Sequence, residues 1–400
     1  MFARILRCVI PLSALAVSVA AFAPSARADE ADATPTAAPT ASPGTADAVG
    51  LPEKTPKEKA PKDKAEKEKI VFSARVFALD MYSSTQDPAT GLAGEWTNRI
   101  SVASARFGAT FSRDDVKAKV DAELDGTPRL RDGYIKLKAS PTFSIRAGLF
   151  KVPASGYELE ELWDLPVVER GMLSDMITSR FQIAGRHSGA NVEFDGEGPF
   201  HPRLRAGVWQ GFDNSGRPVD GTRSGNYASD QVVRGEMGTQ GFTLAAAFES
   251  RSGEAQPGAA PGRYGSGEVD LHYEGQGFRV WLEGMRGTSW FDANSSDGKA
   301  AMFSSGRLLA AWRWDGAKDG EVYVEPFAML SGIDPDDRVQ QDLDWEAVGG
   351  ANAGRWNRWK LQLEYSRQRA GKNSPVGVGP IGLRLPERSA VLLQLAANFE

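Results

Sequence analysis

The chain has 400 residues, with 47 Lys and Arg against 52 Asp and Glu, which gives a formal net charge of −5. This acidic balance disfavours a general nucleic-acid binder, whose surface is normally basic. The single cysteine, Cys8, lies in a segment that we expect to be removed, so the mature chain would have no disulfide and no thiolate nucleophile or metal ligand. With 43 Gly and only 3 His, the composition favours strands and turns over a helical enzyme.

Residues 1–28 have the pattern of a secretory signal peptide. Two arginines precede an apolar run from Cys8 to Ala23, and Ala26-Arg27-Ala28 matches an A-x-A cleavage pattern. A membrane anchor is the alternative, but the run is short for a span and contains Pro11. We therefore expect a cleaved signal and export from the cytoplasm.

Residues 29–69 are of low complexity, rich first in Ala, Pro and Thr and then in Lys and Glu. They offer few apolar side chains to offset the entropy of ordering, so we predict a disordered tether. Contact with a charged periplasmic partner or the cell wall is a less favoured alternative. The folded part is predicted to be residues 70–400.

Beyond the tether, apolar and polar residues alternate with the period of a strand. Val116, Ala118, Val120, Ala122 and Leu124 are apolar, and Lys, Asp or Glu stand between them. A soluble sandwich also alternates, but the second face here is dense in charge, which suits a wet lumen better than a dry core. Such runs number roughly sixteen, and bacterial barrels need an even number. They begin near Val71, Ile100, Val116, Arg131, Phe143, Gly189, Leu204, Gln231, Phe242, Glu268, Phe278, Met302, Glu321, Trp345, Trp359 and Ser389.

The predicted fold is therefore all-β: a transmembrane antiparallel β-barrel of about 16 strands. Ala139-Ser140-Pro141 and Gly275-Gln276-Gly277 would be short periplasmic turns. Asp213–Ser229, Ser250–Tyr264 and Asp292–Ala300 would be longer outer loops. Closure into a barrel would leave no unpaired strand edge in lipid.

A Gly-x-Phe-Lys-x-Pro motif spans 148–153, a Glu-Arg pair stands at 169–170, and an Arg-x-x-Gly pattern runs from Arg186 to Gly189. In this order the motifs resemble the phosphate-selective porin O and P family of outer-membrane channels, in which a Glu-Arg pair precedes the fold-in loop and Arg-x-x-Gly opens the next strand. The resemblance covers roughly Val71–Glu400 and implies a channel for small polar solutes or ions, anions such as phosphate among them. The chain departs from the family at its end, where Glu400 follows the expected terminal aromatic.

Residues 154–184 break the alternation and carry many charges. The resemblance favours a loop that folds inward and narrows the pore, where opposed charges would select solutes. A solvated outer loop is the alternative. The predicted constriction residues are Glu158, Glu160, Glu161, Asp164, Glu169, Arg170, Arg180 and Arg186.

Basic residues on the polar faces of the strands are candidates for solute contact along the barrel wall. Together they would lower the barrier for anions. For any single residue we favour a structural role instead, in pairs with Asp121, Glu123, Asp132, Glu193 or Glu236 on neighbouring strands. The candidates are Arg75, Arg106, Lys117, Lys119, Lys136, Lys138, Arg146, Arg203, Arg205, Arg234 and Arg279.

The sequence offers little that would support catalysis. His187, His201 and His272 lie far apart in the sequence without metal-ligand spacing. We therefore expect a porin in the outer membrane of a Gram-negative bacterium, and not an enzyme, without cofactor or metal. Its expected partners are outer-membrane lipid, small solutes and two further copies of the chain in a homotrimer. Two alternatives stay open: an occluded barrel that acts as an enzyme or adhesin, and a soluble secreted β-protein that binds carbohydrate.

Overall fold

The structure is a computed structural model, and the predicted signal peptide and nearly all of the predicted tether lie outside the residues that it describes. No helix in the described part is long and apolar enough to cross a membrane. The described residues are 68–85, 94–125, 128–210, 229–253, 262–289, 301–314, 322–374 and 387–399.

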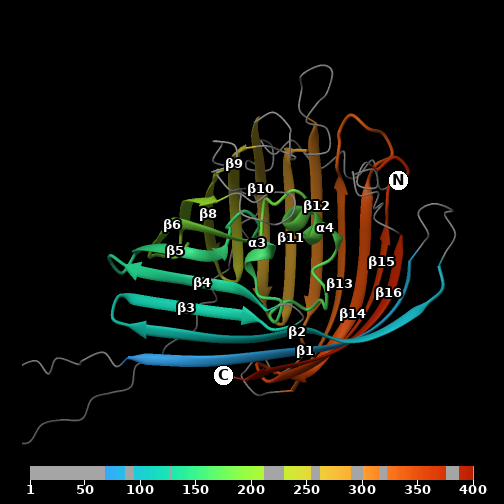
Figure 1. Cartoon of the computed structure of the whole chain (residues 1–400), viewed down its shortest axis with the longest axis horizontal. Coiled ribbons are helices and arrows are strands. Elements are labelled where there is room, and N and C mark those ends of the chain that lie inside the picture. The colour runs from blue at the N-terminus through green and yellow to red at the C-terminus, as the bar shows by residue number, and fades with distance from the viewer. Residues whose placement is uncertain are drawn as a thin grey trace, which may run out of the picture. The chain divides into compact units, whose positions relative to one another are not determined.

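Sixteen antiparallel strands form one closed barrel in which every strand pairs with its neighbours along the chain (Figure 1). The first and last strands close the ring, with Ala74 opposite Phe399 and Thr85 opposite Arg388. The strands are β1 (Lys69–Thr85), β2 (Thr97–Arg113), β3 (Val116–Glu123), β4 (Arg129–Lys138), β5 (Phe143–Lys151), β6 (Arg186–Asp195), β7 (Arg203–Gln210), β8 (Ser229–Thr239), β9 (Phe242–Gly253), β10 (Gly262–Gly275), β11 (Phe278–Thr288), β12 (Met302–Trp312), β13 (Val322–Asp334), β14 (Asp344–Arg355), β15 (Trp359–Arg369) and β16 (Arg388–Phe399).

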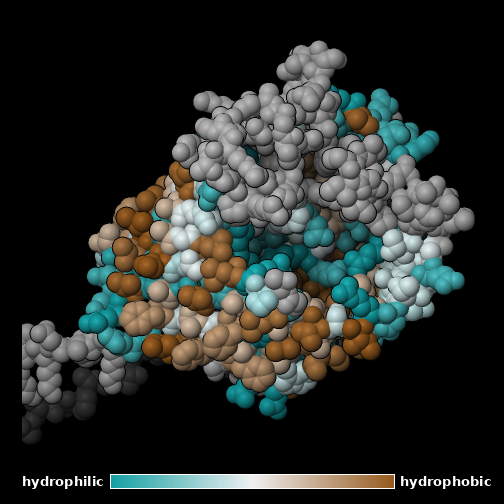
Figure 2. All heavy atoms as spheres, in the orientation of Figure 1, coloured by the Kyte–Doolittle hydropathy of each residue, from teal (hydrophilic) through white to brown (hydrophobic). Residues whose placement is uncertain are grey.

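The barrel is apolar outside and polar inside, the reverse of a soluble protein. In β15, Leu361 and Leu363 are exposed, whereas Lys360, Gln362 and Glu364 are buried. Because successive side chains of a strand point to opposite faces, the alternation in the sequence becomes two different surfaces. Figure 2 shows apolar side chains gathered over the strands at its lower left, beside a hydrophilic hollow.

Exposed aromatic side chains gather at both ends of the barrel. Tyr82 stacks on Trp96 with ring centroids 4.8 Å apart, beside the connection from β1 to β2. At the opposite end, Trp312 stacks on Phe278 at 5.9 Å and on Trp314 at 5.6 Å. Such girdles are typical of the two membrane–water interfaces of an outer-membrane barrel.

The predicted strands agree with the structure in number and closely in position, with three local corrections. β1 begins at Lys69, within the predicted tether. The predicted loop 250–264 is too long, because β9 continues to Gly253 and β10 begins at Gly262. Gly275 ends β10, so the turn before β11 is Gln276-Gly277. In each case polar or glycine-rich residues extend a strand by backbone pairing, which the hydrophobic pattern does not report.

The core lies between the barrel wall and the segment 152–185, hereafter the inner loop, which joins β5 to β6. Three short helical elements lie in it: α3 (Gly156–Leu159), α4 (Met172–Asp175) and the π-helix η2 (Met176–Arg180). Figure 1 shows α3 and α4 within the ring of strands. Tyr157 and Phe181 are fully buried, and Phe181 stacks on Phe303 of β12. The prediction of an inward-folded loop is therefore confirmed.

Candidate functional site

Carboxylates of the wall hold the backbone of the inner loop. Glu346 of β14 accepts a hydrogen bond from the amide of Met172 at 2.7 Å, and Glu364 of β15 accepts one from Val168 at 2.7 Å. Buried amides without a partner are costly, so these carboxylates satisfy groups that have left water. Met172 is the first residue of α4, whose amide has no partner within the helix, and Val168 lies in an irregular stretch, so both amides need a partner from the wall.

Donors of the wall bind the carbonyl groups of the same loop. Lys360 donates to the carbonyl of Trp163 at 2.8 Å, and Asn352 donates to that of Pro166 at 2.8 Å. Farther around the ring, Arg251 of β9 donates to the carbonyl of Phe181 at 3.0 Å. The loop is thus attached to β9, β14 and β15, three strands that are far apart in the sequence from the loop itself.

Arg307 of β12 clamps the centre of the loop. Its guanidinium is fully buried, 2.8 Å from the Ser174 hydroxyl and 3.2 Å from Glu283. It also lies 3.8 Å from the ring centroid of Tyr157, a cation–π distance. One side chain therefore joins the loop helices α3 and α4 to two neighbouring strands.

A cavity of about 470 Å³ remains between the inner loop and the wall formed mainly by β3–β8. Six basic and six acidic side chains line it, so opposite charges are balanced along its surface. The basic residues are Lys119, Arg146, Lys151, Arg203, Arg205 and Arg234, and the acidic ones are Asp132, Glu160, Glu161, Glu193, Glu236 and Asp270.

Ion pairs between strands account for much of this balance. Glu193 of β6 pairs with Lys136 at 2.5 Å and with Arg146 at 2.8 Å. Glu236 of β8 pairs with Arg205 at 3.1 Å and with Arg234 at 2.7 Å. Arg146 with Glu193 and Arg205 with Glu236 join neighbouring strands, as we expected, whereas Lys136 lies two strands from Glu193 and Arg234 is on the same strand as Glu236. All four pairs orient the cations along the wall.

The predicted wall residues do not form one continuous track. Lys119, Arg146, Arg203, Arg205 and Arg234 line the cavity. The other six lie elsewhere. Arg106 and Arg279 are buried against the inner loop, and Lys136 is paired with Glu193. Arg75 donates to Asn398 where β1 pairs with β16, and Lys117 and Lys138 are exposed next to short turns.

Among the predicted constriction residues whose side chains the structure describes, Glu160 and Glu161 line the cavity. Glu158 turns to Ser174 and Arg307, and Glu169 pairs with Arg388 of β16 at 3.2 Å. Arg170 donates to the carbonyl of Tyr157, and the carbonyl of Asp164 accepts a hydrogen bond from Arg279. Arg186 is the first residue of β6 and donates to Asp132. The side chain of Arg180 lies outside the described residues.

The acids of the loop differ in their electrostatic surroundings. Burial raises the pKa of Glu160, and the neighbouring Asp164 carboxylate adds to the rise. Burial would also raise the pKa of Glu161, but Lys151 and Arg186, with Lys119 and Arg106, outweigh it and hold that pKa far below its usual range. Glu161 is therefore a permanent charge at the edge of the cavity.

Lys151 and Asp270 also line the cavity, although neither is among the predicted lining residues. Asp270 stands at an inward position of β10, where alternation with Val269 and Leu271 was a usable signal. Lys151 belongs to the Gly-x-Phe-Lys-x-Pro motif, and its ammonium donates to the carbonyls of Leu159 and Glu160 at 2.9 and 2.5 Å. No local sequence pattern indicated that the Lys151 side chain binds the backbone of the inner loop, which follows it in the chain.

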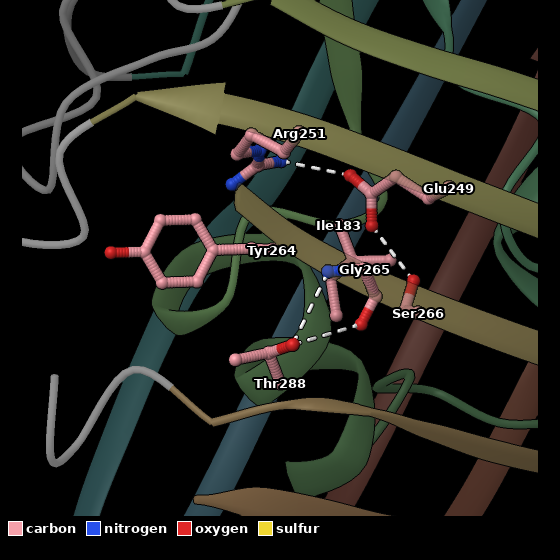
Figure 3. A pocket seen from close by; sticks show the side chains of 7 residues that line it. All are labelled: Ile183, Glu249, Arg251, Tyr264, Gly265, Ser266 and Thr288. Atoms are coloured by element: carbon pink, nitrogen blue, oxygen red, sulfur yellow. Dashed lines mark hydrogen bonds and ion pairs between the residues drawn. The ribbon is translucent and has the colours of Figure 1, made fainter. Parts of the chain in front are cut away.

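A second cavity, of about 10 Å³, lies where the inner loop meets β9 and β10 (Figure 3). Glu249 accepts a hydrogen bond from Ser266 at 2.8 Å and one from Arg251 at 3.1 Å. This space fits a single water molecule, so it belongs to the packing of the loop end. Within the described residues no cluster of His, Cys, Asp or Glu is arranged to hold a metal ion.

Comparison with known proteins shows likeness in structure alone. No family model matches the chain, and no curated protein matches it. The outer membrane channel DcaP of Acinetobacter baumannii is similar with a TM-score of 0.55 at 12% identity, over 84% of this chain and 99% of that chain.

Two further structures give the same result. An anion-selective porin from Comamonas acidovorans has a TM-score of 0.55 at 13% identity, over 83% of this chain and 100% of that one. OmpT of Vibrio cholerae, an outer membrane protein solved in a trimer form, has a TM-score of 0.54 at 11% identity, over 83% and 99%. The chain therefore has the sixteen-stranded barrel fold of outer-membrane porins.

Proposed function

We propose that this protein is a porin of the bacterial outer membrane, through which small polar solutes and ions diffuse passively. The observation that carries the proposal is the charged cavity of about 470 Å³ inside a barrel whose outer face is apolar. A lumen lined by fixed charges suits hydrated solutes, since it replaces part of the water that they shed. The inner loop would narrow the passage, and the cavity that remains beside it would admit the solutes.

The proposed solutes are small ions and polar molecules, with a weak preference for anions that include phosphate. The balance of six cations and six acids in the lining argues against strong selectivity. The preference would come from three guanidinium groups, those of Arg146 on β5, Arg205 on β7 and Arg234 on β8, whose charges an anion would meet in turn. The anion-selective porin from Comamonas acidovorans is consistent with this direction.

The proposed assembly is a homotrimer, as the trimer form of Vibrio cholerae OmpT suggests for this fold. Each barrel would then contain its own pore, because the cavity is lined by residues of one chain. Outer-membrane lipid would contact the exposed apolar face.

Planar-bilayer recording tests the function. The purified full chain should give stepwise ionic currents, and the reversal potential in a KCl gradient should indicate a mild chloride preference. Neutralising Arg146 and Arg205 together, as R146Q and R205Q, should move that potential towards potassium. A folded protein that carries no current would favour the occluded barrel instead.

A further inference from the structure

Glu161 lies in a cluster of cations that come from four different strands. Its carboxylate is 3.4 Å from the Lys151 ammonium, 3.5 Å from the Arg106 guanidinium and 3.7 Å from that of Arg186. Lys119 of β3 lines the cavity beside it. The cations belong to the wall, whereas Glu161 belongs to the inner loop.

The ion pairs of Glu161 are longer than those of other carboxylates in the same region. Asp132 is 2.8 Å from Arg186 and 3.0 Å from Lys119, and Glu123 is 2.6 Å from Arg129. At 2.6–3.0 Å a charge-assisted hydrogen bond forms, whereas beyond about 3.4 Å mainly the Coulomb attraction remains. Glu161 thus neutralises the cluster without being locked to any member of it.

The cluster keeps unused hydrogen-bonding capacity. The Nη2 atom of Arg186 is buried and has no hydrogen-bond partner among the residues that the structure describes. It points to the side of the cluster that Glu161 occupies, at 3.7 Å from the carboxylate. A planar or tetrahedral oxyanion could meet this nitrogen and a neighbouring ammonium at shorter distances.

The backbone at Glu161 is fixed, although its carboxylate is held loosely. Lys151 binds the carbonyls of the two preceding residues, and the carbonyl of Glu161 accepts from the amide of Asp164 at 3.0 Å. The side chain is 28% exposed towards the cavity, so it can rotate away while the loop stays in place.

We propose that Glu161 is a tethered counter-ion in an oxyanion-binding site formed by Arg106, Lys119, Lys151 and Arg186. A permeating carboxylate or phosphate group displaces the Glu161 side chain and binds the same cations, then leaves as Glu161 returns. Asp121, Glu123 and Asp132 face the cluster as well and limit its net positive charge. The site therefore holds an anion briefly, which suits conduction.

This inference rests on the proposed channel function, and block of chloride current by other anions tests it. Wild-type full-length protein and E161Q are compared in a planar bilayer in about 0.1 M KCl, where the Debye length is about 10 Å. Inorganic phosphate is added in one arm and acetate in the other. The concentration that halves the chloride current is measured for each anion.

In E161Q the half-blocking concentration should fall about three- to tenfold for either anion, because one charge a few ångströms from the ligand has been removed. The reversal potential should move towards chloride. K119Q should raise the half-blocking concentration instead. The matched control is E169Q, which removes an equal charge from the same loop. Glu169 pairs with Arg388 and does not line the cavity, so the half-blocking concentration in E169Q should equal that of wild type.

Equal block in E161Q, E169Q and wild type would overturn the inference and leave the channel function standing. Complete absence of current from wild type would overturn both. Heat-modifiable gel mobility verifies that each variant is folded, and K119Q provides an independent reading of the site if E161Q does not fold.

Discussion

Gly148 shows how a single residue permits two chain segments to approach closely. Its φ of 132° lies in a region that side chains disfavour, and an added Cβ would lie 2.2 Å from the carbonyl oxygen of Gly133. The adjacent β4 strand therefore packs against a bare backbone. Gly148 is the first residue of the Gly-x-Phe-Lys-x-Pro motif, so the packing of β4 on β5 explains why the motif begins with glycine.

We expect Gly148→Ala to reduce the free energy of unfolding by roughly 2–4 kcal/mol, from backbone strain and the clash with β4. Urea titration of the barrel in lipid vesicles measures it. Gly284→Ala is the control, because its Cβ would meet nothing within 4 Å and the expected change is within about 0.5 kcal/mol. Equal effects in the two variants would contradict the close approach of β4 to Gly148.

Asp342, in the connection between β13 and β14, should make that connection sensitive to pH. Burial, with the nearby Asp334 carboxylate, raises the pKa of Asp342 to about 7. Its carboxyl accepts a hydrogen bond from the amide of Asp336 at 3.2 Å. A folded-state pKa above the unfolded value of about 3.9 means that the folded form binds the proton more tightly.

The stabilisation from this proton is fully present below about pH 4 and is lost as the pH rises through about 7. Amide hydrogen exchange of residues 335–343, corrected for intrinsic rates, should therefore show less protection at pH 8 than at pH 5.5. Asp342→Asn should remove most of that difference while keeping an acceptor for Asp336. A pH dependence that persists in the variant would assign the effect to another group.

The inner loop is the element on which the site depends. It has three very short helical elements and long irregular stretches, so local propensity cannot stabilise it. Wall side chains replace the missing regular hydrogen bonds on both its amides and its carbonyls. The loop therefore takes its shape from the barrel that surrounds it.

Arg307→Met should loosen this element most. It leaves the Glu283 carboxylate without its guanidinium partner in a buried place, at a cost of about 3–5 kcal/mol. Urea unfolding measures the stability, and limited proteolysis of the loop measures its detachment. Arg203→Met provides the control, since Arg203 and Asp195 are a half-exposed pair at 3.4 Å whose loss should cost about 0–1 kcal/mol.

At the scale of the whole molecule, the barrel reverses the distribution of polarity found in soluble proteins. Apolar residues such as Leu308 and Leu393 are about half exposed, while Arg307 and Gln394 next to them are buried. In the proposed setting an aqueous lumen would accept the charges, and lipid or detergent would cover the apolar outer face.

Leu308→Arg tests the proposed bilayer position, because Leu308 lies at the middle of β12 and points outward. The expected destabilisation is about 2–4 kcal/mol, as for a cation at the bilayer midplane. Val322→Arg, at the end of β13 and equally outward, should cost about 0–1 kcal/mol. Folded fractions from heat-modifiable gel mobility give both values, and a cost independent of depth would contradict the membrane position.

The alternation of residue types by itself determined the fold class, the number of strands and nearly all of their positions. The period of two is a local property, since it depends only on neighbours along one strand. The break in that period at 154–184, read with the family resemblance, also located the loop that folds inward. The predicted pairing of Glu193 and Glu236 with basic neighbours followed from adjacent strands.

The tertiary structure alone decided which charges meet in the lumen. Lys360 and the carbonyl of Trp163 are 197 residues apart in the chain, and Asn352 and Pro166 are 186 apart. No periodic pattern encodes such contacts, because they depend on how far the inner loop reaches across a closed ring. For the same reason Glu160 and Glu161 face the cavity, whereas Glu158 and Glu169, close to them in sequence, turn to the wall.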